Sequence, residues 1–337
     1  MKIRENEWLF LVTSVPELIY TLMSVSEIHA LIQLLDDPDE GVYQHVREEL
    51  MSKGASILPA ILNHRASKSQ CEVHENRLDE LVEGLHGAFV KKAIKNWHDS
   101  GAQNILEGAL LIHKAADPLL DVEAIKAKYE KLKRDVWLEL NEELTALEQV
   151  RILNHVLFSE EGFLNSRSGH PNPQDALIGD VMDLKKGNPL GLGTLYLAIA
   201  RDLKLPIHGV NLPNHFILCY CDEHHVHDGS ELVEGSELPS GILFYINPFS
   251  EGTVIHPSDV SEFLSHLDLP VDESNCGPCA PIDIIRRLIG NVAYAFERNG
   301  KISQSEQMRE LLLYIESGAT ENVESADADG RDDGAEG

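Results

Sequence analysis

The sequence predicts an α+β fold, because two kinds of hydrophobic spacing follow one another along the chain. Apolar residues recur with helical spacing in residues 1–98 and 104–165. Short β-prone segments with alternating side chains begin at Ile207, and helical spacing returns from Ile282. We therefore expect helical regions on both sides of a core in which a helix packs on a small antiparallel sheet.

The composition limits the class of protein. The chain has 337 residues, enough for two or three domains, and 43% of them are hydrophobic, as in globular proteins. Its 56 acidic and 28 basic residues give a net charge of −28, which disfavours nucleic acid as a partner. The chain has no long apolar run and no signal-peptide pattern, so we expect a cytoplasmic protein without a membrane partner.

Residues 1–98 are expected to form a helical region that resembles a HEAT-type repeat. A helical segment begins at Ile28, Asp36-Asp-Pro signals a turn, and the next helix is expected to end at Gly54. The order of helix, acidic proline turn, helix, glycine and helix is typical of such a repeat. Repeats stack because one unit cannot bury its own apolar face, and the stack offers surfaces to protein partners.

Residues 99–272 are expected to hold the core and its helical lead-in. Asp117-Pro separates two helices, and residues 165–174 contain the Gly, Ser, Asn and Pro residues that are typical of a loop. An apolar helix is expected to begin at residues 190–194. Strands are expected at residues 207–210, 215–221 and 241–246, with a further short strand from residue 252.

Residues 273–316 predict a helical hairpin. Pro281 suits the first position of a helix that ends near Asn299, and a second helix is expected over residues 302–315. The pair resembles a tetratricopeptide-type hairpin. Residues 317–337 are mostly Gly, Ala, Ser, Asp and Glu without an apolar cluster, so we expect a disordered acidic tail.

Three segments of the core follow the order in which a thiol active site is built. A thiol nucleophile works best at a helix N-terminus, where the helix dipole stabilises the thiolate. A histidine then accepts its proton, and a carboxylate or an amide orients the histidine. The helix start here has Gly191 and Gly193 at the nucleophile region, with Thr194 as its only hydroxyl. His215 leads one strand and Asn247 ends the next, so Thr194, His215 and Asn247 are the candidates for a vestigial triad.

From about Leu106 to Ile315 the chain resembles the SirB-type transglutaminase-like family of bacteria. The resemblance implies a papain-like core with a helical lead-in and C-terminal tetratricopeptide repeats. The matching segments are Asn154-His-Val-Leu-Phe-Ser-Glu-Glu-Gly-Phe, Gly187-Asn-Pro-Leu-Gly-Leu-Gly-Thr-Leu-Tyr-Leu-Ala-Ile-Ala-Arg, Leu212-Pro-Asn-His-Phe-Ile-Leu, Tyr245-Ile-Asn-Pro-Phe and the Arg286-Arg-Leu helix.

The chain departs from the pattern of this family at the catalytic positions. Members commonly carry Ser near the helix start, Gly-His-Phe at the strand and Asp-Pro-Phe at the later strand. This chain has Gly191 and Gly193, then Asn214-His-Phe and Asn247-Pro-Phe. The departures remove the hydroxyl and the carboxylate, and they leave His215 as the remnant of the triad.

The cysteines allow a second kind of site. An odd count of five in a chain of this length predicts reduced thiols rather than a disulfide framework. Cys219-x-Cys221 and Cys276-x-x-Cys279 are candidate ligands of a zinc ion. A histidine-rich run at residues 224–227 follows the first pair in the sequence. Cys276-Gly-Pro-Cys279 also has the letters of a thioredoxin-like redox motif, and its position before a helix favours a thiolate at Cys279. Buried structural thiols are the commoner reading of such cysteines.

Three functions follow from these patterns. The first is a non-catalytic protein-interaction or regulatory module with a degenerate Cys-His-Asp triad, whose partner binds the flanking helical regions and which needs no cofactor. The second is an amide-bond hydrolase or transferase centred on His215, which needs a hydroxyl or thiol such as Thr194 or Cys219 within reach of its ring. The third is a zinc or redox role of the cysteine pairs.

Overall fold

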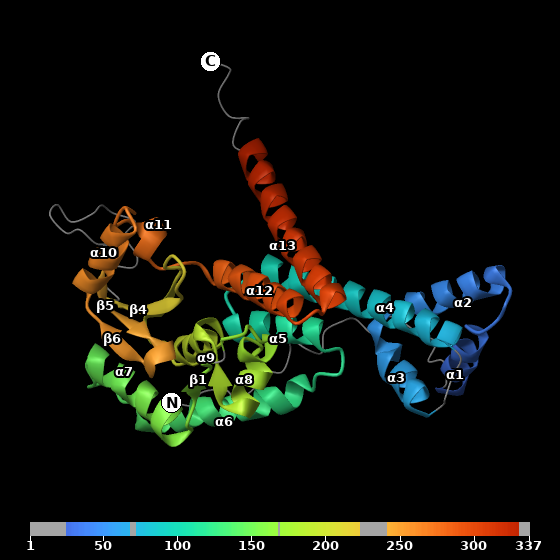
Figure 1. Cartoon of the computed structure of the whole chain (residues 1–337), viewed down its shortest axis with the longest axis horizontal. Helices are drawn as coiled ribbons and strands as arrows, with labels where there is room; N and C mark the ends of the chain where they lie inside the picture. The colour runs from blue at the N-terminus through green and yellow to red at the C-terminus, as the bar shows by residue number, and fades with distance from the viewer. Residues whose placement is uncertain (1–24, 68–71, 168, 223–240, 330–337) are drawn as a thin grey trace, which may run out of the picture. The chain divides into compact units, whose positions relative to one another are not determined.

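The computed structural model describes residues 25–67, 72–167, 169–222 and 241–329 (Figure 1). The chain divides into two compact units, Met1–His86 and Gly87–Gly337. They are called the first and the second unit below. The predicted domain boundaries at residues 98, 272 and 316 stay predictions. Among the described helices, none is both long and apolar enough to cross a membrane.

The first unit is helical, with an apolar core of its own. The Asp36-Asp-Pro turn separates its first two helices, and Asp39 caps the second by accepting hydrogen bonds from the backbone N–H groups of Gly41 and Val42. Gly54 follows that helix with a φ of 65°, a conformation that glycine adopts without strain. Its identity as a HEAT-type repeat stays a prediction. The elements are α1 (Val25–Leu34), α2 (Glu40–Ser52), η1 (Gly54–Ile57), α3 (Leu58–Ser67) and α4 (Glu72–Asp99), which runs past the end of the unit.

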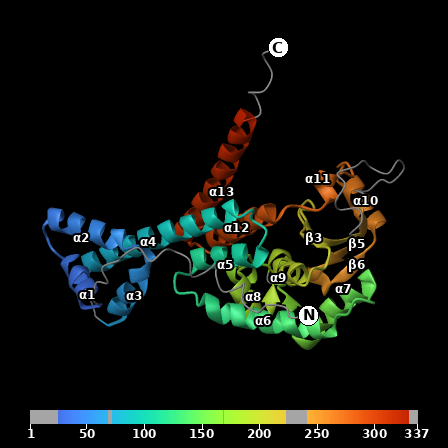
Figure 2. The ribbon, with the colours of Figure 1, turned by 180° about the vertical axis from the view of Figure 1, so that it is seen from behind.

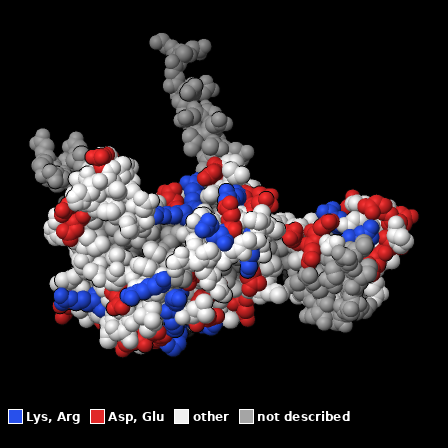
Figure 3. All heavy atoms as spheres, viewed as in Figure 1, with Lys and Arg blue, Asp and Glu red and all other residues white. Residues whose placement is uncertain are grey.

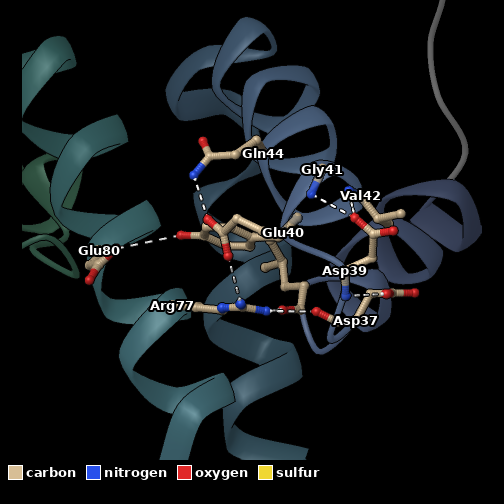
Figure 4. A network of polar contacts seen from close by, with 10 residues as sticks. Asp37, Asp39, Glu40, Gly41, Val42, Gln44, Arg77 and Glu80 are labelled. Carbon is tan, nitrogen blue, oxygen red and sulfur yellow. Dashed lines mark hydrogen bonds and ion pairs between the residues drawn. The ribbon is translucent and has the colours of Figure 1, made fainter.

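Arg77 of α4 holds the end of α1 against the start of α2. Its guanidinium donates hydrogen bonds to the backbone carbonyls of Leu35 (2.7 Å) and Asp37 (3.0 Å), and it reaches the Glu40 carboxylate at 3.4 Å (Figure 4). It also lies 4.0 Å from the centre of the Tyr43 ring. The carbonyls that follow a helix lack partners inside it, so Arg77 supplies the donors that the end of α1 needs.

The second unit has at its centre a four-stranded antiparallel sheet of order β3-β4-β5-β6 (Figures 1 and 2). Helix α9 (Pro189–Asp202) contacts β3 and β4, and α10 (Pro257–His266) contacts β5. This is the small antiparallel sheet with a packed helix that the sequence predicts. The strands are β3 (Ile207–Val210), β4 (Ile217–Cys221), β5 (Ile242–Asn247) and β6 (Thr253–Ile255).

The two faces of the sheet belong to different apolar clusters, because successive side chains of a strand point to opposite faces. Leu218 and Tyr220 lie in the main core, which contains α9. Ile217, Cys219 and Cys221 lie in a smaller cluster that contains Val260 and Leu264 of α10. The alternation predicted along β4 is therefore confirmed.

Helices surround this centre in the order that the sequence predicts. The lead-in comprises α5 (Ile105–Ala116), α6 (Val122–Glu139), α7 (Ala146–Asn154) and the π-helix η2 (His155–Glu160). The segment before α9 contains β1 (Leu164–Asn165), η3 (Pro173–Asp175), α8 (Ile178–Leu184) and β2 (Lys186–Gly187). Around and after the last strands lie η4 (Pro248–Ser250), α11 (Glu273–Cys276), α12 (Pro281–Arg298) and α13 (Ile302–Asp329).

Helices α12 and α13 form the predicted hairpin, with Gly300 at a φ of 73° between them. Helix α13 extends to Asp329, whereas the sequence analysis places the start of a disordered tail at residue 317. The extension has a physical reason, since Ala and Glu in this segment favour helix even without an apolar face. Residues 330–337 lie outside the described residues. The resemblance of the hairpin to a tetratricopeptide repeat stays a prediction.

A buried histidine joins α5 to α8. His113 is 4% exposed, and its Nδ1 accepts a hydrogen bond from the backbone N–H of Gly179 at 3.1 Å. Burial lowers the pKa of His113 to about 4, so its imidazole is neutral at pH 7. Asp180 lies next to it, and burial, followed by the nearby carboxylates of Asp183 and Asp117, raises its pKa to about 6. Above pH 6 the carboxylate of Asp180 is therefore charged in the folded protein, and this charge lowers the free energy of unfolding.

We expect Asp180→Asn to stabilise the protein at pH 7.5 by about 1–2 kcal/mol, measured by urea unfolding. The folded pKa of about 6 is above the ordinary value of 3.8, so the folded state binds the proton more tightly than the unfolded state. The gain should thus shrink as the pH falls from 6 to 4. Glu123→Gln is the control, because the exposed Glu123 pairs with Lys126 and does not raise the pKa of Asp180, so its removal should bring no gain. A gain for Asp180→Asn that does not change with pH would contradict this account.

Candidate functional site

The N-terminal end of α9 is the place where the sequence analysis expects a nucleophile. Asn188 caps the helix, since its Oδ1 accepts a hydrogen bond from the backbone N–H of Gly191 at 2.8 Å. Pro189 occupies the first turn, where its missing N–H costs nothing. All residues from Leu190 to Ala200 are buried, so α9 is enclosed on every side rather than on one face.

Neither glycine of this helix start has space for a side chain. A Cβ atom on Gly191 would clash with the backbone carbonyl oxygen of Asp175. A Cβ atom on Gly193 would lie 2.6 Å from Cε1 and 2.7 Å from Cδ1 of the Phe216 ring. Real Cβ atoms do not approach neighbours this closely, so a serine or cysteine fits at neither position unless its neighbour moves.

No hydrogen bond joins Thr194, His215 and Asn247 to one another in the structure. Thr194 is 1% exposed, and its Oγ1 makes no hydrogen bond to any described residue. The exposed His215 instead has its ring centre 5.3 Å from that of Phe263 in α10. These three site assignments therefore stay predictions from the sequence.

Asn247 performs a local task at the end of β5. Its Oδ1 accepts a hydrogen bond from the backbone N–H of Phe249 at 3.1 Å, and its Nδ2 donates to the hydroxyl of Ser250 at 3.3 Å. Both ends of the amide are thus used to cap η4. An amide that orients a histidine would need one of these ends for the imidazole.

Cys219, Cys221 and Cys276 are buried in apolar surroundings, and Cys279 is partly buried. The Sγ atoms of Cys219 and Cys221 lie 3.7 Å apart, and Cys276 is in the same apolar cluster. Burial raises the pKa of Cys219 well above its ordinary value and that of Cys279 to about 11. Both shifts oppose the thiolate that redox catalysis needs at neutral pH. Within the described ranges, no group of three or more His, Cys, Asp or Glu side chains is placed to hold a metal ion, and residues 224–227 lie outside those ranges.

A cavity of about 410 Å³ lies at the start of α9. Its walls come from the loop after β1, the start of α9, the segment before β4 and the helix α12. Because His170, Asn214 and Tyr294 line it and are exposed, the cavity is accessible to solvent. The polar lining also contains Ser166, Asp175, Asn188, Arg287 and Asn291.

The polar groups of the cavity are tied to one another. Asn188 Nδ2 donates to Asn291 Oδ1 at 2.9 Å, which joins the cap of α9 to α12. The buried hydroxyl of Ser166 donates to the carboxylate of Asp175 at 2.5 Å. These hydrogen bonds hold the lining side chains in place before any ligand binds.

Sequence reasoning missed these cavity residues as a site. Asn188 and Arg287 stand inside the segments that carry the family resemblance, but no short motif marks them as ligand-binding. The pair Arg286-Arg287 in the middle of the apolar pattern of α12 is the sequence signal that could have indicated the cavity. A charged side chain at the edge of a buried helix face needs either an ion-pair partner or a bound ligand.

Comparison with known proteins agrees with the geometry of this unit. Residues 123–290 match the family model of the transglutaminase-like superfamily, and this segment contains α9 and the whole four-stranded sheet. These residues form a transglutaminase-like domain. The predicted SirB-type subfamily and the repeats on either side of the domain stay predictions.

Relatives of the transglutaminase-like domain occur in animals and bacteria. The chain is 28% identical to F-box only protein 21 of Mus musculus over 165 residues, which is 48% of this chain and 24% of that protein. It is 28% identical to a UPF0162 protein of Vibrio cholerae over 120 residues, which is 36% of this chain and 44% of that protein. The chain thus spans less than half the length of these two relatives.

A UPF0162 protein of Pseudomonas aeruginosa aligns over a longer part of the chain. It is 28% identical over 191 residues, which is 56% of this chain and 63% of that protein. No significant match was found among solved structures.

We expect Gly193→Ala to destabilise the transglutaminase-like domain by about 1–3 kcal/mol, measured by thermal or urea unfolding. The new methyl group would push against the Phe216 ring. In a double-mutant cycle, Phe216→Leu should remove part of this loss, because the smaller side chain vacates the space.

The matched control for this substitution is Gly290→Ala in α12. Nothing lies within 4 Å of a Cβ atom at Gly290, so alanine should stabilise that helix by up to about 1 kcal/mol. An equal gain at position 193 would show that the start of α9 has space for a side chain.

Proposed function

We propose that the protein is a non-catalytic transglutaminase-like protein that acts as a protein-interaction or regulatory module. The observation that carries the proposal is the close packing at Gly191 and Gly193, which leaves no space for a nucleophile side chain. The placement of His215 supports it, since the ring of His215 contacts Phe263 of α10. A fold can persist after its chemistry is lost, because function depends on the site and not on the fold.

The proposed partner is a protein that binds the helical regions beside the domain. In the second unit, α12 and α13 expose large side chains of the types that anchor protein interfaces, namely Tyr294 (50% exposed), Ile302 (52%) and Leu313 (64%). Charge patterning supports a protein partner over nucleic acid. Figure 3 shows acidic and basic side chains interspersed over the second unit, without a continuous basic stripe on the face in view.

We expect the purified chain to show no covalent catalysis. Incubation with a fluorophosphonate, an iodoacetamide probe or a dansylated amine and casein should give no activity-dependent label, and His215→Ala should behave as the wild type. The alternative, an amide-bond hydrolase or transferase centred on His215, predicts a labelled hydroxyl or thiol whose reaction disappears in His215→Ala. That result would overturn the proposal. A zinc or redox role of the cysteine pairs is the second alternative, and metal analysis with thiol titration would reveal it.

We expect a photo-crosslinker at position 313 to capture one discrete protein in extracts of the source cell. Unlabelled protein in excess should compete, whereas unlabelled Leu313→Glu should compete at least about tenfold less well, because a charge replaces an apolar contact. The control places the crosslinker at the exposed Glu306 of the same helix. The same products from both positions, or equal competition by Leu313→Glu, would contradict a partner surface on α13.

A further inference from the structure

Arg287 is held at the wall of the α9 cavity by neutral groups. Its Nη1 donates to Oδ1 of Asn211 at 3.1 Å, and its Nη2 donates to the backbone carbonyl of His215 at 2.8 Å. The guanidinium also lies 5.8 Å from the centre of the Phe216 ring. A guanidinium has five N–H donors, so these two hydrogen bonds fix its position and leave donors for a ligand.

Arg287 forms no ion pair with any described residue, although acidic residues outnumber basic ones by two to one. The preceding Arg286 shows the contrast, since it pairs with Asp283 at 3.0 Å. Arg287 is half-buried, and burial lowers its pKa from the ordinary value. A buried charge without a partner costs free energy, which the protein recovers when an anion binds.

The rest of the cavity suits a ligand with one negative charge and polar groups beside it. The amide side chains of Asn188, Asn291 and Asn214 line the cavity and offer donors and acceptors. The N-terminal end of α9 adds a positive dipole end near Asn188. A volume of about 410 Å³ falls in the range of small-ligand pockets.

The carboxylate of Asp175 distinguishes between classes of anion. It is buried and also lines the cavity, so it repels an anionic ligand more strongly when that ligand carries two negative charges than when it carries one. A phosphate carries up to two charges at pH 7, whereas a carboxylate carries one. An arginine binds a carboxylate through two parallel hydrogen bonds, and three of the five N–H donors of Arg287 remain besides the two that bond to Asn211 and His215.

We propose that the cavity at the start of α9 binds the C-terminal carboxylate of a peptide, with Arg287 as its counter-ion. The proposal goes beyond the proposed lack of catalysis, because it assigns a ligand class and a binding residue to the cavity. It also does not depend on the proposed partner surface of α12 and α13, so an experiment can contradict one of the two proposals and leave the other intact.

The test is a calorimetric and NMR titration of the full chain with three probes. They are an acetylated tripeptide with a free C-terminus, the same peptide with an amidated C-terminus, and inorganic phosphate. We expect the free-acid peptide to bind and to shift the side-chain Nε–H resonance of Arg287, and the amidated peptide and phosphate to bind at least about tenfold more weakly.

Four variants make the test specific. Arg287→Met should weaken binding of the free-acid peptide at least about tenfold, and Arg287→Lys should weaken it less. Arg298→Met, which removes an exposed charge from the same helix, should have no effect. Asn291→Asp keeps the acceptor for Asn188 and adds a negative charge to the cavity, so it should weaken binding while the melting temperature stays near that of the wild type.

Four outcomes would overturn the proposal. Equal binding of the free-acid and amidated peptides would mean that the carboxylate is not recognised. Preferred binding of phosphate would assign the cavity to another class of anion. Finally, absence of binding for all three probes would mean that the cavity binds none of them, and binding that is unchanged in both Arg287→Met and Asn291→Asp would show that Arg287 is not the counter-ion.

Discussion

The burial of α9 on every side is the constraint on which the rest of the second unit depends. A helix enclosed by β3, β4, α5, α8 and α12 can have large side chains only where its neighbours are distant. At Gly191 the backbone at Asp175 comes close, and at Gly193 the ring of Phe216 does. These contacts set the distance at which the sheet and the segment before α8 pack against the helix, and for the same reason they leave no space for a side chain at positions 191 and 193.

The alternation of side chains along β4 and the residues just before it determines which side chains lie in the core with α9 and which face α10. Phe216 lies in the core with α9, so the neighbouring His215 is placed outside that core and meets Phe263 of α10. A shift of the strand by one residue would exchange the two, but it would also take Leu218 and Tyr220 out of the main core. The register that stabilises the sheet is therefore the register that places the ring of His215 against Phe263.

Much of the fold could be predicted from the sequence because its signals are local. Asp36-Asp-Pro, Gly54, Asp117-Pro and Asn299-Gly300 mark chain reversals through residue types that act within a few positions, and apolar spacing distinguishes the helices from β4. The helical end of α13 was missed because Ala and Glu serve equally well in helices and in acidic tails.

The cavity could not be predicted in the same way. Ser166, Asn188, Asn214 and Arg287 come from four segments that meet only in the folded chain, and no spacing links them. The sequence placed the start of α9 correctly, whereas His215 lies two residues before β4 and does not lead the strand. The sequence could not show that Phe216 fills the space between α9 and the sheet, because that depends on packing between distant segments.

The packing of Phe216 on Gly193 has a consequence for substitutions at either position. A serine or cysteine at position 193 needs a smaller residue at position 216, and a smaller residue at 216 leaves a void while position 193 is still glycine. Each change alone is expected to lower the stability of the domain, so the two positions are energetically coupled and a substitution at one is tolerated best together with a substitution at the other.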